Sequence, residues 1–137
     1  MMNTAIAFIP WSKDFEIGHE LIDSQHKIFL MLLNKLSQNI AAGYTQEHMF
    51  RVINELKKYA EFHFVSEENV MYECGYPELK AHQHIHSEIL FELSVLEGHV
   101  AHDNAKPEEI YEFLKKWLFN HILYEDSKIV QYLNAQD

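Results

Sequence analysis

The stretch CGYPELKAHQHIH, residues 74–86, ends one helical pattern and begins another. Gly75 and the proline two residues later form this break, since glycine is typical just after a helix and proline just inside the next one. Beyond the break, His82 and His86 are four residues apart and face the same side of a helix, whereas His84 points almost opposite. The stretch therefore predicts two helices joined by a tight turn, and a histidine pair whose metal ion would need further ligands from elsewhere in the chain.

Apolar residues recur with helical period in four segments, which are separated by breaks near Gly43, Gly75 and Pro107. We expect helices over residues 20–41, 45–73, 78–102 and 107–133. Long helices joined by short loops pack as antiparallel neighbours, so the sequence predicts an all-α, up-down-up-down antiparallel four-helix bundle. A single domain is expected over residues 1–137, with a non-helical arm at 1–19 that packs its apolar side chains onto the bundle at 20–133.

The composition is that of a globular protein, with 47% hydrophobic residues and a formal net charge of −10. An acidic chain is a poor partner for nucleic acid or for an anionic membrane surface. The single cysteine, Cys74, excludes an intrachain disulfide and a cysteine-based metal cluster. Neither a signal peptide nor an apolar run long enough to cross a bilayer is evident, so a cytoplasmic location is expected.

Histidines and carboxylates interrupt the apolar faces of all four predicted helices. They are His26, His63, Glu67, His82, His86, His121 and Asp126. In an up-down-up-down bundle, all of these positions lie at the same end of the molecule, where unpaired polar groups would be costly to bury. Their convergence predicts a metal site built from nitrogen and oxygen ligands. The spacing alone does not select Asp126, because five residues correspond to about 140° around an ideal helix.

Other polar residues near this layer have two readings. His19, with Asp23 one turn later, either supports the ligands from outside the metal site or is simply solvated. Glu68 is turned about 100° away from Glu67 and is expected to face solvent. His48, His99 and His102 are expected on the surface, and His84 is expected to face away from the neighbouring histidine pair.

Four sequence blocks carry a family resemblance: IDSQHKIF (22–29), HFVSEENVM (63–71), HQHIH (82–86) and WLFNHILYED (117–126). In this order and spacing they resemble the hemerythrins, in particular the single-domain bacterial type. The resemblance implies a cofactor of two non-haem iron ions, and it is the family rather than the ligand chemistry that selects iron over zinc or manganese. It further implies reversible O2 binding for storage, transport or delivery, without enzymatic activity, and it identifies no protein partner.

The same resemblance assigns the ligands. One iron would bind His82, His86 and His121, and the other would bind His26 and His63. The two carboxylates, Glu67 and Asp126, would bridge the irons together with an oxo or hydroxo oxygen. This leaves one coordination position open for O2, on the iron with two histidines.

Leu118, one turn before His121, is the first candidate for the wall of an O2 pocket. Phe29, Leu30 and Phe62 are further candidates, for which ordinary core packing is an equal explanation. Two alternative functions remain open: a module that senses oxygen, redox state or iron, and a di-iron oxidase or peroxidase. Ferritin-like oxidases repeat a Glu-x-x-His motif on two helices, and here only Glu16 and His19 match it.

Overall fold

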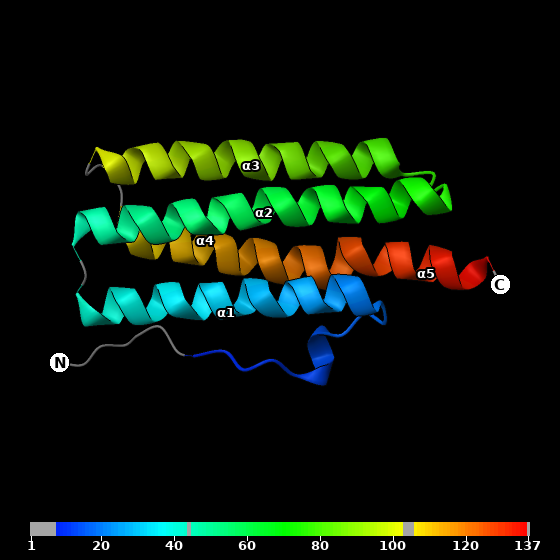
Figure 1. Ribbon diagram of the computed structural model, residues 1–137, viewed down its shortest axis with the longest axis horizontal. Coiled ribbons are helices and arrows are strands. Elements are labelled where there is room, and N and C mark those ends of the chain that lie inside the picture. Colours follow the sequence, from blue (N-terminus) through cyan, green and yellow to red (C-terminus); the bar gives the residue numbers. More distant parts are fainter. Residues whose placement is uncertain (1–7, 44, 103–105, 137) are drawn as a thin grey trace.

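The computed structural model describes residues 8–43, 45–102 and 106–136, and leaves out the side chains of residues 122 and 123. Its helices are α1 (Glu20–Ala42), α2 (Gln46–Cys74), α3 (Leu79–Ala101), α4 (Pro107–Asn120), the π-helix η2 (His121–Asp126) and α5 (Ser127–Ala135). The last three follow one another as a single rod (Figure 1), which packs beside α1 and α3. Successive helices run in opposite directions, which confirms the predicted antiparallel four-helix bundle; the single-domain assignment stays a prediction.

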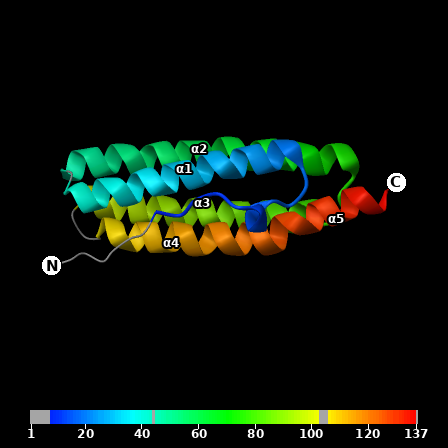
Figure 2. The same cartoon turned by 90° about the horizontal axis from the view of Figure 1, so that it is seen from below.

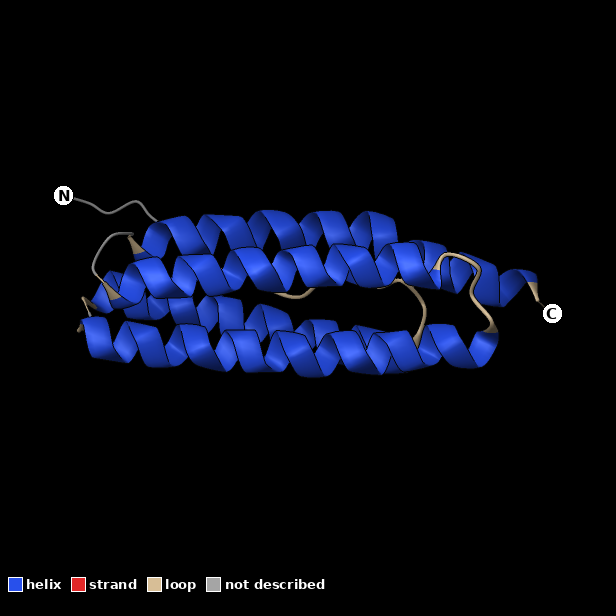
Figure 3. Cartoon of the chain, turned by 90° about the horizontal axis from the view of Figure 1, so that it is seen from above, coloured by secondary structure: helices blue, strands red, loops and turns tan. Residues whose placement is uncertain are grey.

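The connections follow from the residues at the helix ends (Figure 3). Gly43 and Gly75 end α1 and α2 in the left-handed conformation, with φ of +73° and +70°, which residues with a Cβ rarely adopt. The Thr45 hydroxyl accepts a hydrogen bond from the His48 backbone N–H and so caps α2. Pro107 is the first residue of α4 as expected, whereas Pro77 lies two residues before the start of α3.

The N-terminal arm runs along the seam between α1 and the rod that contains α4 (Figure 2). Asn34 of α1 clamps it, because its side chain accepts a hydrogen bond from the Ile9 N–H at 2.9 Å and donates one to the Ile9 carbonyl at 2.7 Å. Phe15 stacks on Phe119 of α4. Two details differ from expectation: residues 13–15 form one 3-10 turn, and Phe8 remains 62% exposed.

Apolar side chains pack on both sides of the predicted ligand layer. The larger cluster contains Phe29, Phe64 and Leu118, and a smaller one contains Met71 and Ile129 beyond the layer. These five side chains are at most 2% exposed. The polar layer therefore lies in a water-poor interior rather than at the open end of the bundle. Within the described residues, none of the helices has the length and hydropathy required to cross a membrane.

Candidate metal centre

A π-helix brings the last two predicted ligands together. The six residues His121–Asp126 form a π-helix, in which backbone hydrogen bonds join residues five apart instead of four. Each turn therefore contains about one residue more than in an α-helix. His121 and Asp126 therefore face the same side, and His121 Nε2 lies 2.7 Å from Asp126 Oδ1. This resolves the spacing that an ideal α-helix could not accommodate. Single π turns within α-helices are frequent at functional sites.

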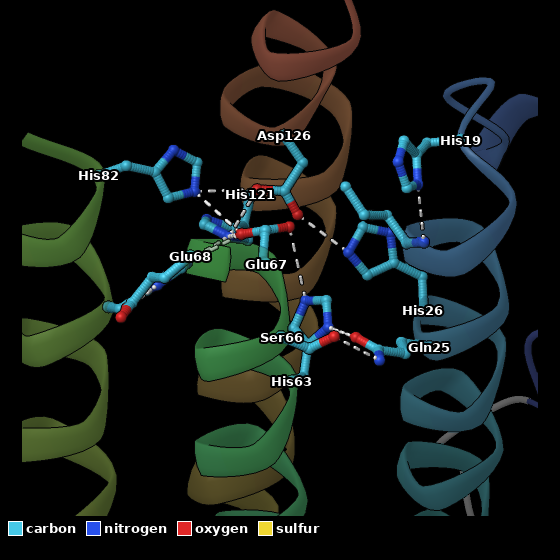
Figure 4. A network of polar contacts seen from close by, with 12 residues as sticks. His19, Gln25, His26, His63, Ser66, Glu67, Glu68, His82, His121 and Asp126 are labelled. Atoms are coloured by element: carbon cyan, nitrogen blue, oxygen red, sulfur yellow. Dashed lines mark hydrogen bonds and ion pairs between the residues drawn. The ribbon is translucent and has the colours of Figure 1, made fainter. Parts of the chain in front are cut away.

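Two groups of donor atoms meet inside the bundle (Figure 4). One contains Glu67, His82, His86, His121 and Asp126, and the other contains His26, His63, Glu67 and Asp126. In each group, one donor atom from every residue lies within 4.8 Å of the others. All seven residues predicted from the sequence are thus brought together, and the two carboxylates belong to both groups.

The first oxygen of each carboxylate faces the three-histidine group. Glu67 Oε1 lies 3.0 Å from the Nε2 atoms of both His82 and His86, and 3.3 Å from that of His121. Asp126 Oδ1 lies 3.1 Å from His82 Nε2. Three imidazole nitrogens and two carboxylate oxygens therefore surround one point.

The second oxygen of each carboxylate faces the two-histidine group. Asp126 Oδ2 lies 2.9 Å from His26 Nε2, and Glu67 Oε2 lies 3.7 Å from His63 Nε2. Each carboxylate thus presents one oxygen to each group, as a ligand that bridges two ions would. The two-histidine group has one imidazole fewer, so an ion bound there would have more room for an external ligand.

A pair of cations would satisfy the donor atoms better than hydrogen bonds among these atoms do. The seven side chains are at most 3% exposed. Even so, the Nε2 atoms of His26 and His63, Glu67 Oε2 and both Asp126 oxygens have no partner with hydrogen-bond geometry. His86 Nε2 and His121 Nε2 lie 3.2 Å apart, although one of two facing ring nitrogens must lack a proton. Buried groups left in this state are costly unless a metal ion satisfies them.

In the metal-free protein, protons bound to histidines supply part of the positive charge that the cations would supply. Burial by itself would lower the pKa of His82 and His121, but contacts with Asp126 and Glu67 outweigh it and raise these pKa values to about 9 and about 10. Burial by itself would raise the pKa of each carboxyl, but contacts with histidines hold it below its usual range: His121, His82 and His86 act on Glu67, and His121 and His26 act on Asp126. His63 behaves differently, because burial dominates and lowers its pKa to about 4.

Metal binding at pH 7 is expected to release about two protons per chain, because His82 and His121 must lose theirs to coordinate an ion. Both pKa values lie above 7, so the metal-free protein holds these protons at neutral pH and loses them as the pH rises through about 9 to 10. The release should therefore shrink, and the apparent affinity should grow, as the pH approaches that range. Titration of Zn²⁺ into weakly buffered metal-free protein with a pH indicator measures this. Release that does not change between pH 7 and pH 10 would contradict it.

Two polar residues support the ligands from outside, and one of them corrects an expectation. His63 Nδ1 lies 2.7 Å from Gln25 Oε1, and His86 Nδ1 lies 2.8 Å from Glu68 Oε2. Glu68 therefore does not simply face solvent: the turn of about 100° from Glu67 directs it at α3. Each contact places the proton on Nδ1 and leaves Nε2 free to bind metal.

The other outer candidates serve the fold instead. His19 caps α1, because its Nδ1 accepts a hydrogen bond from the Ile22 N–H at 3.3 Å. The Asp23 carboxylate accepts hydrogen bonds from the N–H groups of Ile17 and Gly18. Neither residue contacts the ligands, so the supporting role is wrong for both. Of the three histidines expected on the surface, His99 and His102 are exposed and His48 is half-buried; His84, which faces away from the histidine pair, is exposed too.

Replacing Glu68 by alanine is expected to weaken metal binding about 10- to 100-fold, because His86 loses the partner that fixes its ring and its tautomer. Glu61→Ala, on the exposed side of the same helix, is the matched control and should bind as the wild type does. Competition with a chelator of known affinity measures both. Equal affinities for the two variants would show that the contact between Glu68 and His86 does not matter.

Aromatic rings pack against the ligands on the side of the larger apolar cluster. Phe64 stacks on His86 at 3.9 Å between ring centroids, and Trp117 stacks on His121 at 5.3 Å. Phe29 meets the His63 ring edge-on at 5.8 Å. Phe64 and Trp117 were not predicted for this role, although Phe64 follows the ligand His63 directly and Trp117 precedes His121 by one turn.

The four predicted pocket residues have different positions. Leu118 and Phe29 are buried in the larger apolar cluster next to the metal centre. Leu30 is buried too, but it lines a groove under the N-terminal arm. Phe62 is 59% exposed, so the prediction that it forms part of an enclosed pocket wall is wrong. It precedes His63 by one residue and is therefore turned away from the ligand layer.

Comparison with known proteins agrees with this geometry. The family described as Hemerythrin HHE cation binding domain matches residues 17–133. The chain is 30% identical over 136 residues to a bacteriohemerythrin of Stenotrophomonas maltophilia, covering 95% of this chain and 84% of that protein. It is 30% identical over 118 residues to a myohemerythrin of Theromyzon tessulatum, covering 86% and 88%. A crystal structure of a hemerythrin variant superposes with a TM-score of 0.81 at 27% identity, covering 89% of this chain and 94% of the other.

Proposed function

The chain belongs to the hemerythrin family, and on this premise we propose that it binds O2 reversibly at a centre of two non-haem iron ions. The observation that carries the proposal is the pair of donor groups that share Glu67 and Asp126, each with one oxygen on either side. This arrangement suits two cations side by side. The iron pair, when bound, supplies the electrons and the open coordination position that O2 requires.

In this proposal the ligands divide as the two donor groups do. His82, His86 and His121 hold one iron, and His26 and His63 hold the other. The second set offers one imidazole fewer, so O2 would be bound on that side. The protein keeps the Nε2 atoms of His63 and His86 unprotonated through Gln25 and Glu68, and places the iron pair where water has little access.

An apolar environment with little water favours the release of bound O2 over its reduction at the site. The stacked rings of Phe64 and Trp117 cover the three-histidine side, and Phe29 covers His63. Within the described residues, the ligands are embedded between two apolar clusters, and the Glu68 carboxylate beside them is held by His86. A site of this kind has few groups that could deliver protons for oxygen activation. We therefore propose a carrier or store of O2 rather than an enzyme.

Cycles of oxygenation test this proposal. The iron-loaded protein is reduced without air, exposed to O2 and then returned to argon, while its visible spectrum is recorded. A carrier gives a charge-transfer band that appears and disappears over repeated cycles, with about one O2 taken up per chain. Oxidation that occurs once and does not reverse would overturn reversible binding and would favour a redox sensor or an oxidase.

Leu118 is proposed as a wall of the O2 site, since it is buried one turn from the ligand His121. Shortening it to alanine should admit water and raise the rate at which the oxygenated protein autoxidises, by about 10-fold. Leu114→Ala, one turn further from the metal centre, is the control. Both changes should cost about 2–5 kcal/mol of stability, but only Leu118→Ala should change the rate. Equal autoxidation rates, followed by the decay of the oxygenated spectrum, would remove Leu118 from the site.

A further inference from the structure

A pocket of about 430 Å³ opens on the surface between α3 and the segment formed by η2 and α5. It lies near the start of α3, at the end of the bundle where α5 extends beyond α3 (Figure 1). The lining residues that matter here are Tyr76, Glu78, Ala81, His82, Glu125 and Lys128. Among the pockets in the described part of the chain, this one includes a residue of the metal centre.

His82 separates the pocket from the metal centre. The residue is 3% exposed, and its Nε2 lies 3.0 Å from Glu67 Oε1 and 3.1 Å from Asp126 Oδ1. Its other ring nitrogen, Nδ1, points away from both carboxylates (Figure 4). Among the described residues, Nδ1 has no hydrogen-bond partner, in contrast to His86, whose Nδ1 is held by Glu68. His82 is therefore the ligand nearest to solvent and lacks the contact that fixes its neighbour.

The pocket has a negative lining. Glu78 and Glu125 both line it. Of the two cationic side chains in the lining, Lys128 lies 3.6 Å from Glu125, and His82 is paired with Glu67 and Asp126 on the inner side of its ring. The Glu78 side chain makes no capping hydrogen bond to α3. Burial, together with the charges of Glu78, Glu125 and Asp126, raises the pKa of Tyr76, as expected where the potential is negative.

We propose that this pocket is the entry route for divalent cations into the metal centre, with Glu78 and Glu125 drawing in the hydrated ion and His82 binding it first. The inference rests on the proposed two-iron centre. A divalent ion arrives with its water shell, which a polar, negatively charged passage accommodates and an apolar one does not. An ion in the pocket would meet the Nδ1 side of His82, and the bridging carboxylates lie directly behind the ring, because Nε2 on its far side contacts an oxygen of each.

The rate of metal uptake tests this route. Metal-free protein is mixed with Co²⁺ in a stopped-flow instrument, and the absorbance of the bound ion is followed. The variant Glu78→Gln/Glu125→Gln should load about five-fold more slowly at low salt and still reach two ions per chain. The variant Lys128→Gln, which leaves Glu125 uncompensated, should load faster than the wild type. High salt should bring all rates together.

The control carries the same change in charge elsewhere on α3. Glu88 and Glu92 line a separate surface hollow, and Glu88→Gln/Glu92→Gln should load within about two-fold of the wild-type rate. Equal slowing in the two double variants, or no slowing in either, would overturn the entry route while leaving the metal centre intact. A wild-type protein that never binds two ions would overturn the proposed function itself, so the two failures are distinguishable.

Discussion

Alanine at Glu67 is expected to abolish the two-iron centre and O2 binding with it. Glu67 contributes an oxygen to both donor groups, and its Oε1 lies within 3.3 Å of three imidazole nitrogens. Without it, each group loses a ligand and the two ions lose one of the two side chains that hold them together. Iron per chain, measured by a colorimetric assay after anaerobic loading, should fall from about two to one or less.

Glu61→Ala provides the comparison for this change, because Glu61 lies on the same helix with its side chain 44% exposed. That variant should retain about two irons and a normal oxygenation spectrum. Circular dichroism shows whether both variants keep their helices. A folded Glu67→Ala protein that still held two irons and bound O2 would refute the assignment of Glu67 as a bridging ligand.

Removal of metal is expected to lower the melting temperature by about 10 °C or more. Ions that bind only the folded chain stabilise it by about 4 kcal/mol when present at 1,000 times their dissociation constant. For a domain of this size, 1 kcal/mol corresponds to about 3 °C. Moreover, chelation leaves buried polar atoms without hydrogen-bond partners, His63 Nε2 and Glu67 Oε2 among them. Thermal unfolding of chelated and reloaded protein measures the difference.

The Glu67→Ala variant separates this effect from a general action of the chelator. With its centre dismantled, its melting temperature should change little when metal is added or removed. The wild type should recover its higher value on reloading. Equal melting temperatures for the chelated and reloaded wild type would indicate that the seven buried side chains are stable without cations, contrary to the electrostatic argument.

The bundle and its ligand layer can be predicted because both depend on periodicity. A polar residue such as His26 or Glu67 at a core position is visible wherever the apolar repeat is clear, and the up-down topology then fixes its height in the bundle. The π-helix cannot be predicted in this way, because no residue type specifies it. For that reason the distance between His121 and Asp126 is a result of the structure, whereas the choice of Asp126 came from the family resemblance.

The supporting residues could not be assigned from the sequence for a related reason. An angle around a helix shows that Glu68 points away from Glu67, but not which neighbouring helix occupies that side. In the structure α3 lies there, and Glu68 meets His86. The supporting role of Gln25 likewise depends on α2, which places His63 beside it. By contrast, the exposed position of Phe62 follows from its angle next to His63 and could have been anticipated.

The most direct test of the account is a crystal structure of the iron-loaded protein, with anomalous scattering measured at the iron edge. The account predicts two adjacent peaks, one bonded to His82, His86 and His121 and the other to His26 and His63, with Glu67 and Asp126 spanning both. A single peak, or iron bound outside these seven side chains, would contradict the two-iron centre and every function proposed from it.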